Sequence, residues 1–498
     1  MSALPIYTTR AIRKLEALAT QASGAPTLME RAGAAAAEFA RSLCGDTAKA
    51  VLVLAGPGNN GGDAFEVAAH LKRGYFRVSV VFAGERDRLP KDALAALGKL
   101  EAAGGTLLGE IPRDVRFDLG IDGLFGIGLT RPLEGAYAAL VGKLNALGAP
   151  ILSLDIPSGI NAGTGAVMSC AVRASHTITF IAHKVGLLTL DGPDHCGALK
   201  LDTLGIDPAT VLDPEGELLD ESILEGAIRP RPRNFHKGQA GSVGVLGGSA
   251  GMVGAAVIAG RAALKCGAGR VYLGLLTPRP PHVDYTQPEL MLRKPSAVTE
   301  KGLVNMLVAG PGMGRTASAK NVLRSALAAP VPLLLDADAL NLIAATRALA
   351  SAVSKRNAPT IMTPHPAEAA RMLGRTTREA QSDRVASARE IARRYRSLVV
   401  LKGNGSVIAA QEGAFWINPT GNPGMASAGM GDALAGMIAA LCAQGTDPLQ
   451  ALLAATYLHG AAADALAAAG SGPFGITASE VIDQARVLLN AGISEAKS

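Results

Sequence analysis

Short, uninterrupted runs of aliphatic residues alternate with longer alanine-rich stretches along the whole chain. The runs include AVLVLA, VSVVF, PILSLD, SVGVLG, VPLLLD and LVVLKG, at residues 50–55, 78–82, 150–155, 242–247, 331–336 and 398–403. Strands that are apolar at every position, and not only at alternate ones, are typical of parallel sheets covered by helices on both faces. The pattern predicts an α/β chain in which strands and helices alternate from end to end.

The alternation is interrupted between residues 206 and 230. The segment there is rich in turn-forming and acidic residues and runs into the sequence RPRPR at residues 229–233. Glycine-rich loops that follow apolar runs occur on both sides of it. A chain of 498 residues can hold two large α/β domains. We therefore place one domain at residues 1–218 and a second at residues 225–495.

Composition narrows the class of protein. Hydrophobic residues make up 48% of the chain and charged residues 18%, the balance of a globular protein and not of a disordered one. The net charge of +6 could indicate nucleic-acid binding, but the basic residues are scattered, and aromatic residues, at 4%, are too few for base stacking. We expect no nucleic acid, and anionic small molecules as partners.

Cysteine usage and hydropathy bear on the compartment. The five cysteines form no CxxC pair, so neither a zinc site nor a disulfide framework is indicated, and the sparse set fits a reducing cytoplasm. The N-terminus lacks the apolar core of a signal peptide. Residues 238–260 carry no charge and could span a bilayer, but they contain eight glycines, which favour a strand, a turn and a helix. We expect a cytoplasmic protein with no membrane segment.

The sharpest local signal in the first half is GPGNNGGD at residues 56–63, between the first apolar run and a helical stretch. A glycine-rich turn that opens a helix presents backbone N–H groups and the positive end of the helix dipole to phosphate. The spacing is not the GxGxxG pattern of dinucleotide-binding folds. The alternative is a tight turn with Asp63 as the N-cap of the helix.

Two further turns follow apolar runs in the same half. Asp122 ends one run and is followed by GIGLTRP at residues 126–132, and DIPSG begins at Asp155. Open sheets bind ligands at the carboxyl ends of their strands, so Asp155 is a candidate acid or base and Arg131 a candidate phosphate ligand. Lys184 is a possible cationic partner, with an ordinary surface lysine as the alternative.

Together these motifs resemble one family, the YjeF N-terminal domain, which is the NAD(P)H-hydrate epimerase. The resemblance covers residues 5–215, includes LMERAG at residues 28–33 and implies a Rossmann-like three-layer α/β/α fold. We take Asp155 and Lys184 as the catalytic residues. The residues implied to bind the hydrated dinucleotide are Asn59, Asn60, Gly61, Gly62, Asp63, Gly126, Ile127, Gly128, Leu129, Thr130, Arg131, Pro132 and Asp155.

The same resemblance implies a bound potassium ion. Its ligands would be Asn60, Asp122 and Ser158. Amide, carboxylate and hydroxyl oxygens suit a hard cation.

In the second half, glycine-rich and acidic motifs follow one another. They are HKG at 236–238, GGSAG at 247–251, GPGMG at 310–314, DADAL at 336–340, TPHPAE at 363–368, KGNGS at 402–406 and GNPGMASAGMGD at 421–432. Several have ordinary alternatives, such as His365 as a satisfied polar residue and Asp338 as a helix cap. The last motif places backbone N–H groups at a helix start, where they would stabilise a transferring phosphoryl group. Asp432 there could accept a hydroxyl proton, and we expect the helix dipole to keep it ionised. The alternative is an N-cap role for Asp432.

The motif order resembles the ribokinase-like α/β fold and, within it, the YjeF C-terminal domain, the ADP- or ATP-dependent NAD(P)H-hydrate dehydratase. The resemblance implies a catalytic Asp432 and magnesium accompanying the nucleotide. Residues implied to face the hydrated dinucleotide are Ala255, Gly314, His365 and Asp432, and those implied to bind ADP or ATP are Lys402, Gly403, Asn404, Gly405, Ser406 and Gly431.

Both halves imply one repair pathway for hydrated NADH and NADPH. The first would interconvert the R and S epimers of the hydrate. The second would phosphorylate the hydroxyl of the S epimer with ADP or ATP and eliminate phosphate, releasing AMP or ADP and restoring NAD(P)H. The chain would act on small molecules, as a homo-oligomer of four or more copies.

Two alternatives remain open. One is a ribokinase-type kinase for a small alcohol, fused to a binding domain. The other is a first half that serves only for ligand sensing or as a scaffold. The sequence argues against this alternative, because it retains Asn60, Asp122, Asp155 and Ser158.

Overall fold

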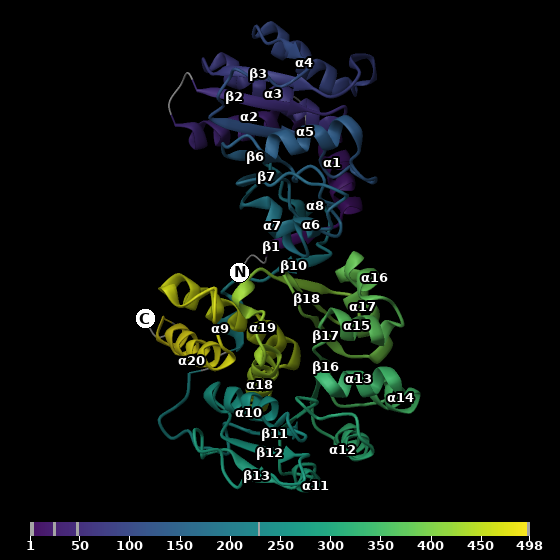
Figure 1. The fold of residues 1–498 in the computed structure, drawn as a ribbon, viewed down its shortest axis with the longest axis vertical. Helices are drawn as coiled ribbons and strands as arrows, with labels where there is room; N and C mark the ends of the chain where they lie inside the picture. Colours follow the sequence, from purple (N-terminus) through teal and green to yellow (C-terminus); the bar gives the residue numbers. More distant parts are fainter. Residues whose placement is uncertain (1–3, 23–25, 46–48, 228–229, 496–498) are drawn as a thin grey trace. The chain divides into compact units, whose positions relative to one another are not determined.

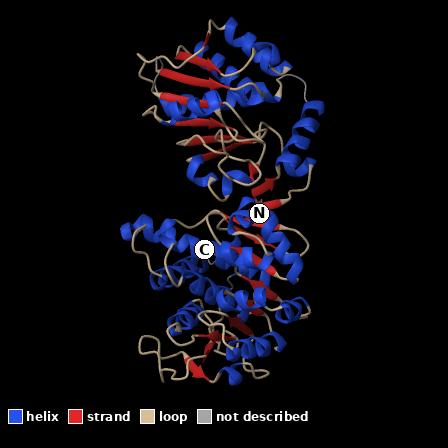
Figure 2. Ribbon diagram, turned by 45° about the vertical axis from the view of Figure 1, so that its right-hand side comes forward, coloured by secondary structure: helices blue, strands red, loops and turns tan. Residues whose placement is uncertain are grey.

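The computed structural model describes residues 4–22, 26–45, 49–227 and 230–495. Its contacts divide the chain into two compact units, one at Pro5–Gly216 and the other from Glu217 onward together with Leu4, and each unit is described by itself. In both units, strands lie between helices (Figure 2). This confirms the α/β class expected from the alternating pattern.

The first unit is built on a seven-stranded parallel sheet in the order β4-β3-β2-β5-β6-β7-β9. Its strands are β2 Ala50–Ala55, β3 Arg77–Phe82, β4 Leu107–Leu108, β5 Leu119–Gly123, β6 Ile151–Leu154, β7 His176–Phe180 and β9 Ala198–Asp202. Outside this sheet, β1 Leu4–Tyr7 is parallel to β8 His183–Lys184. The helices are α1 Thr9–Ala22, α2 Leu28–Cys44, α3 Asn59–Arg73, α4 Lys91–Ala102, α5 Gly135–Asn145, the short α6 Val185–Leu188, α7 Gly192–Cys196 and α8 Pro208–Val211, and the 3-10 turn η1 Arg86–Arg88.

The central strand β2 shows why these runs are apolar at every position. Val51 and Val53 pack into one hydrophobic cluster, and Leu52 and Leu54 into another on the opposite face of the sheet. Because side chains alternate across a strand, both faces of the sheet need apolar residues. The unit is therefore a three-layer α/β/α sandwich, as predicted.

The second unit holds the strand order β13-β12-β11-β14-β15-β16-β17-β18-β19-β10. The pairs from β13 to β17 are parallel, β18 is antiparallel to both of its neighbours, and β19 and β10 are parallel. The strands are β10 Gly216–Leu218, β11 Ser242–Gly247, β12 Arg270–Leu275, β13 Met291–Arg293, β14 Met306–Ala309, β15 Leu333–Leu335, β16 Thr360–Met362, β17 Leu398–Leu401, β18 Ser406–Ala409 and β19 Phe415–Asn418.

Helices follow most of these strands (Figure 1). They are α9 Ile223–Ala227, α10 Val253–Lys265, α11 Pro295–Val298, α12 Ala317–Ala328, α13 Ala337–Ala345, α14 Arg347–Ser354, α15 Pro366–Leu373, α16 Thr377–Ser382, α17 Arg384–Tyr395, α18 Met430–Ala443, α19 Pro448–Leu466 and α20 Ala478–Glu495, with the short turns η2 Pro423–Met425 and η3 Ala467–Ser471. The uncharged segment 238–260 forms β11, a glycine turn and the start of α10, as predicted.

Two helix starts differ from the alternatives left open by the sequence. The N-cap of α3 is Gly58, so Asp63 lies inside the helix, and its interpretation as an N-cap is wrong. The N-cap of α18 is Gly429, which has φ 90° and leaves Asp432 in the first turn. Neither carboxylate caps its helix, because the helices begin before them, at Asn59 and at Met430.

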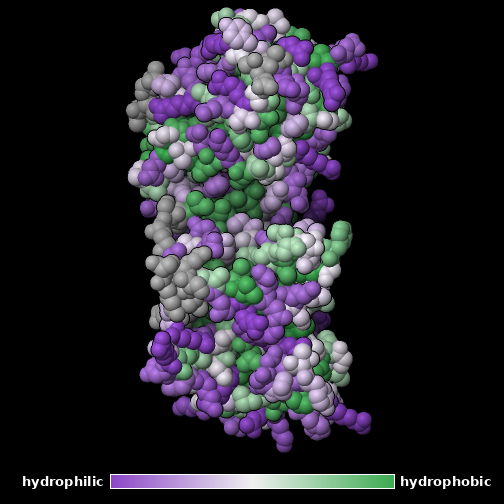
Figure 3. All heavy atoms as spheres, turned by 90° about the vertical axis from the view of Figure 1, so that its left-hand side faces the viewer, coloured by the Kyte–Doolittle hydropathy of each residue, from purple (hydrophilic) through white to green (hydrophobic). Residues whose placement is uncertain are grey.

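One helix, Pro448–Ser471, is long and apolar enough to cross a membrane by length and composition alone. In its most apolar stretch of 18 residues, 61% is buried inside the protein. A helix in the core of the second unit has the same properties. On the face shown in Figure 3, hydrophilic residues predominate at the surface, with smaller groups of hydrophobic residues between them.

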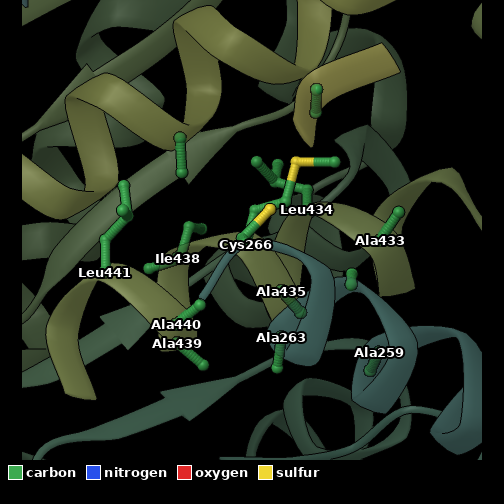
Figure 4. Packing of buried hydrophobic residues seen from close by; sticks show 14 of the residues in the cluster. Ala259, Ala263, Cys266, Ala433, Leu434, Ala435, Ile438, Ala439, Ala440 and Leu441 are labelled. Atoms are coloured by element: carbon green, nitrogen blue, oxygen red, sulfur yellow. The ribbon is translucent and has the colours of Figure 1, made fainter. Parts of the chain in front are cut away.

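The core of the second unit depends on a close approach of α10 and α18. Small side chains meet between them, including Ala259 and Ala263 from α10 and Ala435 and Ala439 from α18 (Figure 4). A Cβ at Gly436 would overlap the backbone carbonyl of Ala259. The position of α18 against α10 is therefore fixed by backbone contact.

We expect Gly436→Ala to lower the free energy of unfolding of the second unit by about 1–3 kcal/mol through overpacking. Alanine favours helices over glycine, so the matched change Gly254→Ala in α10, where nothing lies within 4 Å of the added Cβ, should stabilise it. Denaturant unfolding of both variants measures the difference. Equal changes in stability would contradict the close contact.

Candidate active sites

The first candidate site lies at the carboxyl ends of the strands, where the order of the first sheet reverses between β2 and β5. The turn from β2 into α3 packs so closely against the chain after β5 that a Cβ at Gly56 would overlap the carbonyl oxygen of Leu124. The N-cap of α3 is Gly58, which has no side chain that could cap the helix. The N–H groups at this helix start are therefore open to an anionic ligand.

Three predicted residues from three different loops meet here. Asn60 lies in the first turn of α3, Gly126 follows β5 and Asp155 follows β6. A Cβ at Gly126 would lie 3.0 Å from Asp155 Oδ2 and 3.3 Å from Asn60 Oδ1. The glycine thus leaves space in front of both polar groups, and the N–H of Ile127 donates to Asp155 Oδ2 over 3.3 Å.

Asp155 and Lys184 form a buried ion pair. Lys184 Nζ lies 2.5 Å from Asp155 Oδ1, and it also donates to Thr179 Oγ1 and to the carbonyl of Phe180, each over 2.8 Å. The Lys184 side chain is 1% exposed, so its interpretation as a surface lysine is wrong. Asp155 has φ 66°, in the left-handed region that few non-glycine residues adopt. Such strain is typical of functional sites.

Two of the three potassium ligands predicted from the sequence, Asp122 and Ser158, are joined by hydrogen bonds. Ser158 Oγ donates to Asp122 Oδ1 over 2.6 Å, and its backbone N–H donates to Asp122 Oδ2 over 2.8 Å. Asn60 is buried, and neither its amide oxygen nor its amide nitrogen has a hydrogen-bond partner among the described residues. A buried amide without a partner is costly, so an oxygen-seeking cation would fit here.

The remaining predicted residues of this site differ in their exposure to solvent. Leu129 is buried in the core beneath the loop, and Asn59 lies exposed at the start of α3. Exposed positions of the second turn are Gly128, Thr130, Arg131 and Pro132. No hydrogen bond or ion pair of Arg131 is found in the part of the chain that the structure describes, so its role as a phosphate ligand stays a prediction.

Sequence reasoning missed one carboxylate of this site. Burial and the nearby Asp155 raise the pKa of Glu16, on α1, to about 6. Burial and the neighbouring Asp155, Glu16 and Glu66 raise the pKa of Asp63. No sequence signal marked Glu16, because it lies in an ordinary amphipathic helix that comes near the loops only through tertiary packing.

The second candidate site surrounds the start of α18. Lys402, which follows β17, is paired with Asp336, which follows β15, at 2.8 Å between Nζ and Oδ1. A Cβ at Gly431 would lie 3.1 Å from Lys402 Nζ and 3.5 Å from Asp336 Oδ2. The ion pair therefore lies directly against the N-terminus of α18, beside Asp432.

The electrostatics of Asp432 correct one expectation. Burial, with a further contribution from Asp336, raises the pKa of Asp432 to about 7, although Lys402 acts in the opposite direction. The helix dipole was expected to keep the carboxylate ionised. Desolvation outweighs it, because a charged group removed from water loses more than the dipole returns. Asp432 is thus poised between its two protonation states near neutral pH.

Two further groups of predicted residues lie around this site. His365 is the N-cap of α15 and forms a capping box with Glu368. It is therefore a satisfied polar residue, as the alternative interpretation expected, with or without contact to a ligand. Asp338 accepts a hydrogen bond from Gly314 N over 2.9 Å, so it joins two motifs and is not a helix cap. Ala255 lies close to the same loop, 3.2 Å from where a Cβ on Gly312 would be.

The loop at residues 402–406 is glycine-rich and tightly supported. Gly403 and Gly405 have φ of 141° and 59°, and Ser406 Oγ donates to the carbonyl of Gly403 over 2.9 Å. The buried Arg384 donates to the carbonyls of Leu401 and Lys402 behind the loop. Five of the six predicted nucleotide-binding residues lie in this loop, which runs from Lys402 to the start of β18. The sixth is Gly431.

Comparison with known proteins identifies both halves. The family model of the NAD(P)H-hydrate dehydratase matches residues 243–485, and that of the YjeF-related protein N-terminus matches residues 25–186. Among solved structures, the ADP/ATP-dependent NAD(P)H-hydrate dehydratase from Bacillus subtilis, co-crystallised with ATP and Mg²⁺, is 32% identical, covering 55% of this chain and 96% of its own, with a TM-score of 0.47.

Relatives match over nearly the full length. The bifunctional NAD(P)H-hydrate repair enzyme Nnr of Coxiella burnetii is 37% identical over 494 residues, which are 97% of this chain and 99% of the relative. That of Escherichia coli is 38% identical over 474 residues, 94% of this chain and 90% of the relative. The chain therefore belongs to the family of bifunctional NAD(P)H-hydrate repair enzymes, which join an epimerase domain to a ribokinase-like, ADP/ATP-dependent dehydratase domain.

Proposed function

We propose that the two activities use two separate sites, with epimerisation at Asp155 and dehydration at Asp432. The observation that carries this assignment is that the two carboxylates lie in different compact units, Asp155 in an ion pair with Lys184 and Asp432 beside the ion pair of Lys402 and Asp336. The domain ranges 1–218 and 225–495 are part of the same proposal.

Epimerisation requires a proton acceptor at the hydroxyl of the substrate. Water that adds across the enamine double bond of a dihydronicotinamide leaves its hydroxyl on the carbon next to the ring nitrogen. When Asp155 accepts the hydroxyl proton, the carbon–nitrogen bond breaks to give an aldehyde, and the ring nitrogen takes up a proton. Rotation and reclosure by the reverse steps invert the carbon. Asp155 would thus act as general base and then as general acid.

Lys184 supports this step through its hydrogen bond to Asp155. Its ammonium is already hydrogen-bonded to Asp155, Thr179 and the carbonyl of Phe180, so all three of its N–H groups are used. It fixes the orientation of the Asp155 carboxylate and compensates its charge. We therefore assign Lys184 as a positioning residue.

A potassium ion would complete the first site. Asn60, Asp122 and Ser158 would hold it, because the buried amide oxygen of Asn60 has no partner among the described residues, and Asp122 and Ser158 offer a carboxylate and a hydroxyl that are hydrogen-bonded to each other. When bound, the ion would supply positive charge that orients the loops around the dinucleotide.

Exchange into buffer free of potassium and sodium is expected to slow epimerisation and lower the melting temperature of the protein. The reason is that the Asn60 amide then loses the ion that satisfies it. Asn60→Leu, which removes the unpartnered amide at similar volume, should abolish the response to added potassium. An unchanged rate and melting temperature would count against a bound ion.

Dehydration begins with phosphoryl transfer. Asp432 takes the hydroxyl proton of the S epimer while the terminal phosphoryl group of ADP or ATP, bound as its magnesium complex, moves to the hydroxyl oxygen. The N–H groups at the start of α18 stabilise the negative charge that develops. The ring nitrogen then expels phosphate, and loss of a proton from the adjacent carbon restores the double bond of NAD(P)H. AMP or ADP is the second product.

The decisive experiment follows the absorbance of NADH. The chain is incubated with the purified S epimer and ADP, then ATP, and afterwards with the purified R epimer. Return of NADH from both epimers supports the two-site function. Consumption of nucleotide with a stable phosphorylated product would favour a small-alcohol kinase, and activity on the S epimer alone would favour a first unit that only binds ligand.

Two further expectations belong to this proposal. We place the protein in the cytoplasm, because its five cysteines are all free, as in a reducing compartment. We also propose that it assembles as a homo-oligomer of four or more copies, which light scattering would measure.

A further inference from the structure

The environment of Asp336 stands out in the second unit. It occupies the N-cap position of α13, yet its side chain makes no capping hydrogen bond. Its carboxylate is instead turned to Lys402, 66 residues further along the chain, and is 2% exposed. A carboxylate at an N-cap usually stabilises its own helix, so the lost cap indicates another use.

Lys402 differs from the other buried lysine in how many of its N–H groups are used. The ammonium of Lys184 has three acceptors. Asp336 is the single acceptor of Lys402 Nζ within the described ranges, and the Lys402 side chain is 21% exposed. Two donors of Lys402 therefore remain available to a ligand.

The pair also faces the place where phosphoryl transfer would occur. The space on Gly431 that a Cβ would fill lies within 3.5 Å of both Lys402 Nζ and Asp336 Oδ2. The charges of Glu368 and Asp432 also act on Lys402, and both raise its pKa. A flexible lysine surrounded by carboxylates could turn toward any of them, and the hydrogen bond to Asp336 selects one orientation.

We propose that Asp336 is a positioning residue for dehydration, whose carboxylate holds the Lys402 ammonium at the N-terminus of α18 so that its free N–H groups meet the transferring phosphoryl group. This inference rests on the proposed dehydratase function. It assigns two different roles: the side chain of Lys402 would act on the phosphoryl group, and the backbone of its loop would bind the nucleotide.

The test compares Asp336→Asn with Asp284→Asn. Asp284 is a partly buried carboxylate in an ion pair with Arg261 in the same unit, at 2.6 Å, and it has no assigned role. We expect Asp336→Asn to lower kcat for the S epimer with ADP by about 10²-fold, the order of effect of a misplaced or lost donor, with a much smaller change in KM. Asp284→Asn should keep the wild-type kcat.

A double-mutant cycle distinguishes positioning from a structural role. If Asp336 acts through Lys402, the double variant Asp336→Asn/Lys402→Met loses no more activity than Lys402→Met alone. Losses that multiply, or a wild-type kcat for Asp336→Asn, would overturn the inference.

Chemical rescue provides a second measurement if a variant unfolds partly. Added ethylammonium should restore part of the turnover of Lys402→Ala, but not of Asp336→Asn/Lys402→Ala, because Asp336 must hold the added ion. Equal rescue in both would also overturn it. Absence of wild-type turnover would instead refute the dehydratase function itself.

Discussion

Asp432→Asn is expected to lower ADP-dependent dehydration of the S epimer by about 10²–10⁴-fold, while ADP still binds. The substitution keeps the shape of the side chain but removes the group that accepts the hydroxyl proton. Because Gly429 is the N-cap of α18, no capping hydrogen bond is lost with the carboxylate. The loss should therefore appear in kcat and leave the stability of the helix nearly unchanged.

The pH dependence of the wild-type protein tests the same assignment. Burial raises the pKa of Asp432 to about 7, so the carboxylate is mostly protonated, and inactive as a base, below that pH. Dehydration measured as kcat/KM should rise as the pH increases through about 7 and then level off.

The Asp432→Asn variant should lose that rise together with most of its activity. Epimerisation by the same sample serves as the internal control, because it takes place in the other unit. Near-wild-type turnover of the S epimer by Asp432→Asn would remove the catalytic role.

The strands could be predicted from the sequence because their signal is local. Residues 50–55 and 242–247 form strands with the predicted bounds, since a central parallel strand needs apolar side chains on both faces. Helix starts were harder. One alternative from the sequence made Asp63 the N-cap of α3, but the helix begins at Asn59.

The sites could be predicted only in part. Residues at the ends of parallel strands were identifiable, because the carboxyl ends of such strands gather at one edge of a sheet. Partners distant in sequence were not. Asp336 and Lys402 are joined only by the order of β15, β16 and β17 in the sheet, and Glu16 approaches Asp155 only through the packing of α1.

The protonation state of Asp432 was also beyond the sequence. The helix dipole is a local property and could be inferred from the motif. Desolvation depends on how many atoms from other elements surround the carboxylate, which only the folded structure shows.

Asp155→Asn is expected to reduce enzymatic epimerisation at least about 10²-fold, since the amide cannot accept the hydroxyl proton. Asparagine is among the residues that best tolerate the left-handed region, so φ 66° at this position stays accessible. Its amide oxygen can still accept a hydrogen bond from Lys184, which keeps its other two acceptors. Asp155→Ala is a poorer test, because it adds backbone strain and removes one of the three hydrogen-bond acceptors of Lys184.

Conversion of purified R epimer, corrected for the uncatalysed rate, measures the loss from Asp155→Asn. Dehydration of purified S epimer by the same sample should continue at the wild-type rate, because Asp155 and Asp432 lie in different compact units. A melting temperature close to that of the wild type would confirm that Lys184 remains accommodated. Undiminished epimerisation would exclude Asp155 as the base. An equal loss of both activities would contradict two independent sites, because a carboxylate that serves only epimerisation cannot affect a phosphoryl transfer completed in the other unit.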